Sequence, residues 1–244
     1  MQKLSKEIMG TIQTHGELIQ RLKRTSDIES FRFSVSEKID FLPGQFLKVV
    51  FDTKNPNNKE LNKYLSLSSS PTKEYIEVTK KLSGSAFSEK LNALEVGDKV
   101  YFQGPLGNCI FKAEYKKIAF LIGGIGITPV NSIMEYIYDK KLNNDVVLLY
   151  SNRTEEIAFK KELDFWQTTN NIKVYYTITD CKPTDNKCIA GLINKDLLLQ
   201  MIKDWSQRVF FVFGPQSMIN SMRKLCFNVG CEENNINTEV FIGY

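Results

Sequence analysis

The hydrophobic pattern of the chain changes its period once, near residues 111–117, and this change limits the possible folds more than any other feature. Before it, short apolar or alternating runs are separated by turn segments such as DFLPG and GPLGN, which is typical of an antiparallel barrel or sandwich. After it, apolar runs alternate with segments of helical spacing, which predicts a mostly parallel sheet with helices on its faces. We therefore predict two domains, an N-terminal antiparallel β-barrel over residues 1–112 and a C-terminal α/β Rossmann-like domain over residues 113–244.

The composition of the 244-residue chain is that of a soluble globular protein, with 42% hydrophobic and 25% charged residues. Its first residues contain no continuous apolar core, and the most apolar stretch, IAFLIGGIGITPV, is too short and too rich in glycine to cross a bilayer. We expect a cytoplasmic protein without membrane association. The formal net charge of +4 and the lack of a Lys/Arg run do not indicate nucleic-acid binding, but they are compatible with an acidic protein partner.

Cysteine and histidine usage argues against several kinds of site. The five cysteines are odd in number and form no CxxC pair, so we expect reduced thiols and predict no metal site. The single histidine, His15, would have to support Ser-His-Asp chemistry or a histidine-rich metal site alone. A surface position is the simpler interpretation of His15, so neither chemistry is predicted.

Three glycines stand where the apolar run AFLI meets a segment of helical spacing. Glycine at 123, 124 and 126 permits a sharp turn and the close approach of a ligand. Thr128 is a suitable N-cap and Pro129 suits the first helical position, so a helix N-terminus able to bind a pyrophosphate is expected. The GxGxxG pattern is incomplete, because Pro129 replaces its last glycine. A tight turn and a phosphate cradle therefore both remain open.

Two further strand ends carry similar signals, and parallel sheets bind ligands at this edge. Gly214 and Pro215 follow the run FFVF and precede a helical segment that contains Met218. Ser151 and Arg153 follow the run VLLY and precede a segment of helical spacing that opens with two glutamates. Arg153 can bind a phosphate, or it can be an ordinary solvated charge.

The first half of the chain contains two polar stretches of its own, KYLSLSSSP and GSAFSEKL. A lysine, several hydroxyls and an expected helix start can together hold a second phosphate group. Each of these features taken alone is more often a turn than a site.

In this order, the stretches resemble the ferredoxin–NADP reductase superfamily of flavoproteins over nearly the whole chain. The matching stretches are LPGQF, KYLSLSSSP, GSAFSEKL, GPLGN, GGIGITP, GPQSM and the terminal TEVFIGY. The resemblance implies a barrel that binds FAD, or FMN in some members, and a second domain that binds NADPH or NADH.

The resemblance also implies residue roles. Ser66 would lie by the flavin N5 atom, Glu239 near the reaction centre, and Phe241 over the flavin until the nicotinamide displaces it. An ordinary carboxylate at Glu239 and simple core packing at Phe241 remain alternatives. The other cofactor-binding residues implied are Lys63, Tyr64, Leu65, Leu67, Ser68, Gly84, Ser85, Ala86, Phe87, Ser88, Gly124, Gly126, Thr128, Pro129, Ser151, Arg153, Gly214, Pro215, Met218 and Tyr244.

The chain departs from the family pattern at three positions. Lys63 replaces the usual arginine, which keeps the charge but loses the bidentate fork for phosphate. Leu65 replaces an aromatic residue that stacks on the flavin. Phe213 replaces a cysteine found in many members, so no thiol is expected at the nicotinamide.

The resemblance predicts a flavin-dependent enzyme in which NAD(P)H delivers hydride to flavin N5 and the electrons pass to a one-electron carrier such as ferredoxin or flavodoxin. This chemistry belongs to the cofactors and needs no catalytic histidine. The chain lacks a C-x4-C-x2-C iron–sulfur run, so the acceptor is expected to be separate. Ser151 and Arg153 favour NADPH slightly, although NADH-using members also carry an arginine there. The alternatives are a flavin subunit of a larger redox complex, a free-flavin or ferric reductase, and a nucleotide-binding regulatory module without catalysis.

Overall fold

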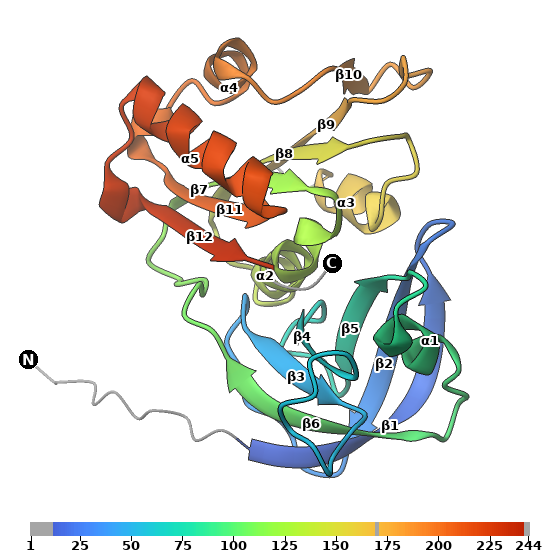
Figure 1. Ribbon diagram of the computed structural model, residues 1–244. Coiled ribbons are helices and arrows are strands. Elements are labelled where there is room, and N and C mark those ends of the chain that lie inside the picture. The colour runs from blue at the N-terminus through green and yellow to red at the C-terminus, as the bar shows by residue number, and fades with distance from the viewer. Residues whose placement is uncertain (1–11, 169–170, 242–244) are drawn as a thin grey trace, which may run out of the picture.

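The computed structural model describes residues 12–168 and 171–241, which form two sheets with their helices, one above the other in Figure 1. Tyr244, one of the predicted cofactor-binding residues, lies outside the described residues. Among the helices in the described part of the chain, none is long and apolar enough to cross a membrane.

The first sheet is antiparallel and forms a nearly closed barrel with the strand order β4-β3-β6-β1-β2-β5. Its strands are β1 (Ile12–Lys23), β2 (Ile28–Val35), β3 (Phe46–Val50), β4 (Asn62–Ser66), β5 (Ile76–Lys81) and β6 (Lys99–Leu106). A bridge between Leu67 and Val78 joins the two edges of this sheet. Inward side chains such as Phe31, Phe33 and Phe102 fill the barrel, because alternate residues of each strand face its interior. Helix α1 (Ala86–Asn92) follows β5.

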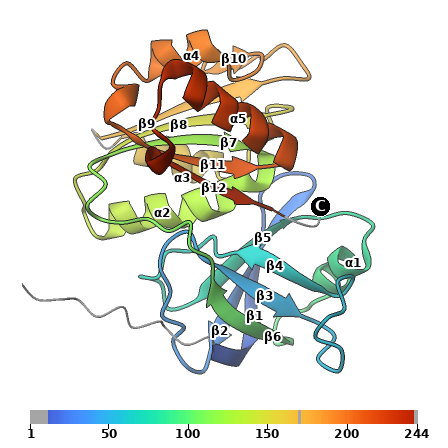
Figure 2. The same ribbon diagram turned by 60° about the vertical axis from the view of Figure 1, so that its left-hand side comes forward.

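The second sheet is parallel, with the strand order β10-β9-β8-β7-β11-β12. Its strands are β7 (Lys117–Gly123), β8 (Asp145–Asn152), β9 (Ile172–Ile178), β10 (Cys188–Ala190), β11 (Val209–Gly214) and β12 (Ile236–Val240). Its helices are α2 (Ile127–Asp139), α3 (Lys160–Trp166), α4 (Lys195–Met201) and α5 (Gln216–Val229). Helices α2 and α3 cover the face nearer the barrel, and α4 and α5 cover the other (Figures 1 and 2). The central strands are almost entirely apolar because both of their faces are buried.

The predicted fold class, a barrel followed by a parallel α/β sheet, is confirmed. The predicted N-cap at Thr128 is wrong. A 3-10 turn over Gly124–Gly126 runs directly into α2, and the Thr128 hydroxyl donates to the carbonyl of Ile125 at 3.1 Å instead of capping the helix.

The helix expected from the two glutamates after β8 also begins later than predicted. Phe159 has a left-handed backbone with φ of 61°, and α3 starts only after it. The carboxylates of Glu155 and Glu156 instead accept hydrogen bonds from other segments, Glu155 from Thr184 and Glu156 from Ser26. These contacts hold the segment in a non-helical form despite its helical spacing.

Candidate cofactor site

A cavity of about 1250 Å³ lies at the carboxyl ends of the parallel strands. Residues of both domains line this cavity, since Ser26, Asp27 and Lys81 of the barrel lie opposite the end of the second sheet. The residues predicted from sequence that line this cavity are Gly123, Gly124, Ser151, Arg153, Pro215 and Met218. A site at this edge is what the topology of a parallel sheet predicts, and its size is sufficient for a nucleotide.

The strand register brings the three strand ends together. Gly123 at the end of β7 lies opposite Ser151 of β8, and Ile122 lies opposite Phe213 of β11. A Cβ atom placed on Gly214 would lie 3.5 Å from the backbone nitrogen of Gly123. The ends of β7, β8 and β11, which are far apart in the sequence, therefore form one continuous edge of the sheet.

The glycines after β7 are required for different physical reasons. A Cβ on Gly126 would overlap the carbonyl group of Phe213, so a side chain is excluded there by packing inside the protein. Gly124 has φ of +51°, lines the cavity, and has no described atom within 4 Å of its Cβ position. Thr128 and Pro129 are buried in the first turn of α2. Gly123 also lines the cavity, but a Cβ there would overlap Sδ of Met218, so Gly124 is the glycine of this loop with open space for a ligand.

Two residues at the end of β8 differ in exposure and pairing. The Arg153 side chain is 82% exposed, and its Nε atom lies 3.9 Å from Oδ2 of Asp180. Asn152 is buried and lines the cavity, and its Nδ2 group has no hydrogen-bond partner among the described residues. A buried donor without a partner is uncommon in folded proteins, and here it fits a nucleotide that supplies the acceptor. The sequence analysis missed Asn152, although its position at a strand end was an available signal.

The predicted flavin-binding stretch begins in β4. Leu65, Ser66, Leu67 and Ser68 are buried, whereas Tyr64 is 54% exposed. Lys63 is half-buried.

The second predicted flavin stretch contains a cluster of hydroxyl groups at the start of α1. The Ser88 hydroxyl is hydrogen-bonded to those of Ser83 and Ser85, at 3.2 and 3.1 Å. Gly84 and Ala86 are exposed, whereas Phe87 is buried against Phe51 in the barrel core. The hydroxyls fit a ligand with phosphate groups, but the Phe87 side chain belongs to the core.

The structure adds a residue that the sequence analysis missed, Lys80 on β5. Its side chain is buried, and this burial lowers the pKa of the amine, with repulsion from Lys63 and Lys81 adding to the effect. The like charges of Lys63, Lys80 and Lys81 lie close enough to repel one another, and such a cluster favours the binding of an anion. This donor set, together with the hydroxyls before α1, fits the phosphates of a flavin nucleotide. The signal in the sequence was the pair of lysines that ends β5.

The C-terminal strand brings a carboxylate to the barrel. Glu239 on β12 is half-buried, and burial raises its pKa to about 7. A Cβ atom on Gly107 would lie 3.3 Å from Oε2 of Glu239 and 2.7 Å from the ring of Phe46. Phe46 is itself paired with Ser66 across β3 and β4. The residues predicted as Ser66 and Glu239 are thus brought to the same side of the barrel.

Phe241 stacks on Phe213, with ring centroids 6.3 Å apart and an angle of 16° between the planes. Phe213 is fully buried at the end of β11, at the position where many members of the resembled family have cysteine. The contact gives Phe241 a packing role, and it also places an aromatic ring at the end of the sheet beside Gly214.

Two family models match consecutive parts of the chain. An oxidoreductase FAD-binding domain matches residues 15–111, and an oxidoreductase NAD-binding domain matches residues 120–224. The fold and this pair of domains define a flavin-dependent oxidoreductase that uses a nicotinamide nucleotide. By this pair of FAD-binding and NAD-binding domains, the chain belongs to the ferredoxin–NADP reductase superfamily.

Curated relatives match most of this chain at low identity. Flavohemoprotein A of Dictyostelium discoideum is 25% identical over 98% of the chain and 63% of the relative. Nitrate reductase [NADH] 1 of Nicotiana tabacum is 28% identical over 83% of the chain and 25% of the relative. The chain therefore spans less than two thirds of the length of these relatives.

Solved structures share the fold. The FAD/NAD-binding domain of a nitric oxide dioxygenase from Vibrio cholerae matches with a TM-score of 0.81 at 18% identity, covering 93% of this chain and 98% of that one. The cytochrome b5 reductase domain of Ulva prolifera nitrate reductase matches with a TM-score of 0.80 at 22% identity, covering 93% and 97%.

Proposed function

We propose that this protein passes electrons from a nicotinamide nucleotide, through its FAD, to a one-electron carrier protein such as ferredoxin or flavodoxin. The observation that carries the proposal is the cavity at the end of the parallel sheet, which Gly124 and Arg153 line together with Lys81 of the barrel. Because residues of both domains line this cavity, a nucleotide bound there would also contact the flavin-binding domain. When bound, FAD supplies the chemistry, since it accepts an electron pair and releases single electrons.

In this proposal, the residues of the chain position the two cofactors and exclude water. Ser66, buried at the end of β4, orients the flavin near its N5 atom. Phe241 covers the flavin face when no nicotinamide is present. Glu239, whose pKa burial raises to about 7, holds or releases a proton at neutral pH.

The proposed donor is NADH. The slight sequence preference for NADPH depended on Ser151 and Arg153, but Arg153 lies beside the carboxylate of Asp180. That carboxylate offsets the charge of the arginine and would repel a 2′-phosphate. The plant relatives that match the chain carry NADH in their names, which supports the same assignment.

The proposed acceptor is an acidic protein, because the chain has a formal net charge of +4 and complementary charge speeds the encounter of redox partners. A second candidate is that the chain serves as the reductase part of a larger redox complex. The curated relatives favour this candidate, since one is a flavohemoprotein and another a nitrate reductase, and both extend well beyond the matched region.

The decisive experiment is an anaerobic titration of the FAD-loaded protein with NADH and with NADPH, followed in the visible spectrum. We expect NADH to bleach the flavin at lower concentration than NADPH. The reduced protein is then mixed separately with ferredoxin, flavodoxin, a haem protein, free flavin and a ferric chelate. Fast, salt-sensitive oxidation by ferredoxin or flavodoxin supports the proposal. Oxidation only by the haem protein favours the complex-subunit alternative, and protein that binds no FAD would leave only the regulatory-module alternative.

A further inference from the structure

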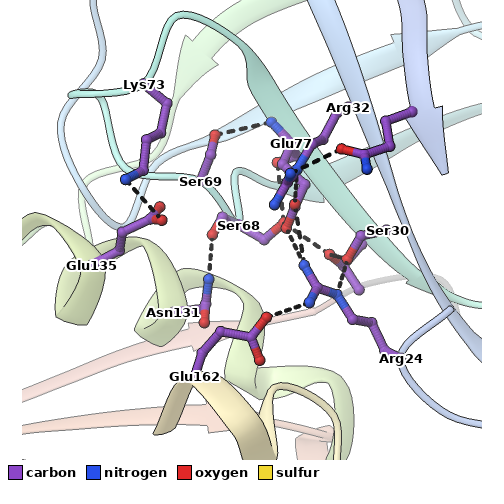
Figure 3. Close-up of polar contacts among 12 residues, drawn as sticks. Arg24, Ser30, Arg32, Ser68, Ser69, Lys73, Glu77, Asn131, Glu135 and Glu162 are labelled. Carbon is purple, nitrogen blue, oxygen red and sulfur yellow. Dashed lines mark hydrogen bonds and ion pairs between the residues drawn. The ribbon is translucent and has the colours of Figure 1, made fainter. Parts of the chain in front are cut away.

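Helix α2 holds the segment that follows the predicted flavin strand, residues 66–73, which we term the flavin strap. Asn131 donates its side-chain amide to the carbonyl of Ser68 at 2.7 Å, and the Ser132 hydroxyl donates to the carbonyl of Ser69 at 2.7 Å. Figure 3 shows the first of these contacts, with Asn131 pointing from α2 toward Ser68. The two α2 side chains are 5% and 0% exposed, so both hydrogen bonds are shielded from water.

The next turns of α2 continue the contact. Glu135 accepts from the backbone nitrogen of Ser70 at 2.7 Å and pairs with Lys73 at 3.2 Å. Asp139 pairs with Lys73 at 2.9 Å and also accepts from the hydroxyl of Thr72. Residues 131, 135 and 139 lie four apart and therefore form one polar stripe along the helix. Side chains from successive turns of one helix thus hold the strap over most of its length.

The barrel holds the same strap from the other side. Glu77 is buried, and its carboxylate accepts from the Ser68 hydroxyl at 2.8 Å and from Arg32 at 2.8 Å (Figure 3). The backbone nitrogen of Glu77 donates to the Ser69 hydroxyl at 2.9 Å. Arg24 lies 3.2 Å from Glu77 and 2.5 Å from Glu162 of α3, so this network also reaches the second sheet.

The position of α2 links its hydrogen bonds with the strap to the nucleotide cavity. The helix begins directly after Gly126, at the end of the loop whose Gly124 lines the nucleotide cavity. The strap begins at Ser66, the predicted neighbour of the flavin N5 atom. A rigid helix therefore joins the nucleotide loop to the flavin strand.

We propose that Asn131 and Ser132 are positioning residues that fix the strap and the end of β4 relative to the nucleotide loop, residues 123–126. In this way they set the separation of nicotinamide and flavin for hydride transfer. This inference rests on the proposed function. Hydride transfer requires the reacting atoms at contact distance, and a displacement of about 1 Å can reduce a rate about 100-fold.

The chemistry of Asn131 supports a positioning role. Its Oδ1 atom is buried and has no hydrogen-bond partner among the described residues. A leucine at this position would remove that unpartnered acceptor, but it would leave the Ser68 carbonyl without its donor. The contribution of the side chain therefore lies in its donor, which acts on the strap.

The test compares Asn131→Ala and Ser132→Ala with Asn144→Ala. Asn144 is a matched control, because it is 2% exposed and donates its amide to the carbonyl of Tyr115 at 2.6 Å. It lies immediately before β8, far from the strap in the sequence. The limiting rate of flavin reduction by NADH is measured by stopped flow, with the dissociation constants of FAD and NADH and the melting temperature. Hydrogen exchange of residues 67–72 is measured in the flavin-free protein as a readout that does not depend on activity.

We expect Asn131→Ala to lower the limiting rate about 10- to 100-fold and Ser132→Ala about 5- to 30-fold, while both dissociation constants change less than about 3-fold. Exchange in the strap should accelerate in both variants. Asn144→Ala should lower the melting temperature by a similar amount without changing the rate or the exchange. The milder Ser132→Ala keeps the test valid if Asn131→Ala does not fold.

Two other outcomes overturn the inference in distinguishable ways. If wild-type flavin is reduced but the strap variants reduce it at the wild-type rate, or all three variants slow equally, the bonds serve stability alone. If the flavin of the wild-type protein is not reduced by either nucleotide, the proposed function fails and the inference fails with it.

Discussion

The flavin strap and the nucleotide edge are built in opposite ways. The strap is fixed from both sides by protein hydrogen bonds, from α2 on one side and from Glu77 on the other. The nucleotide edge has an exposed Arg153 and an Asn152 whose amide donor lacks a partner among the described residues. A site with its bonds already formed is preorganised, whereas a site with open donors gains them from its ligand. The contrast suits a resident flavin and an exchanging nucleotide.

The largest predicted effect is at Gly126, where the nucleotide loop meets α2. Gly126→Ala would place a methyl group against the Phe213 carbonyl, so β11 or the loop must move. We expect a loss of about 1–3 kcal/mol in the free energy of unfolding, measured by denaturant titration, because the overlapping atoms are backbone. Gly84→Ala is the control, since no described atom lies within 4 Å of its Cβ position. Equal stability of the two variants would contradict the packing explanation.

The second effect is at Lys80, on the flavin side. Burial lowers the pKa of Lys80, and its positive charge would attract a flavin phosphate. Lys80→Met removes this charge and should weaken FAD binding about 10- to 100-fold, which corresponds to roughly 1.5–3 kcal/mol. FAD affinity is measured by fluorescence quenching, with Lys90→Met on the exposed side of α1 as the control. Unchanged affinity would place the phosphates elsewhere.

The two sheets and the glycine loop show how much of the molecule could be predicted from the sequence. The change of hydrophobic period predicted the two sheet types, because burial on one or both faces of a sheet imposes different patterns. The glycine loop could be located, but glycine required by packing and glycine required by a ligand look the same in sequence. In the structure, the overlap with the Phe213 carbonyl marks Gly126, whereas a φ of +51° and open space at its Cβ position mark Gly124.

Contacts between distant segments were not predictable. The helical spacing after β8 was overridden at Phe159, where tertiary contacts of the neighbouring glutamates hold a different backbone. Asn131 and Ser132 read as ordinary helix residues, and their role depends on a strap more than sixty residues away in the sequence. Local patterns carry no information about such pairings.

The third effect concerns Glu239, where the two regions meet. Its pKa is raised to about 7 by burial, so the protonated form is favoured in the fold. The stability it contributes is complete below the unfolded pKa of about 4.3 and is lost as pH rises through 7. The melting temperature of the flavin-free protein should fall between pH 5 and 8 by a few degrees more in the wild type than in Glu239→Gln, since about 1 kcal/mol moves it by roughly 2–4 °C. Parallel curves for the two proteins would show that Glu239 is charged throughout this range.

The smallest effect sharpens the nucleotide side of the comparison. Arg153 and Asp180 are both exposed, so their pairing at 3.9 Å is worth about 0.2–1 kcal/mol. Asp180→Asn frees the arginine and removes a negative charge, so it should lower the KM for NADPH about 2- to 5-fold and leave the KM for NADH nearly unchanged. Arg153→Ala should raise the KM for NADPH and change that for NADH much less. Steady-state reduction of a dye acceptor with each nucleotide measures both. If each substitution changed the KM for NADPH and for NADH equally, Arg153 and Asp180 would not contact the 2′ position of the nucleotide. Other residues of the nucleotide edge would then determine the choice between NADH and NADPH.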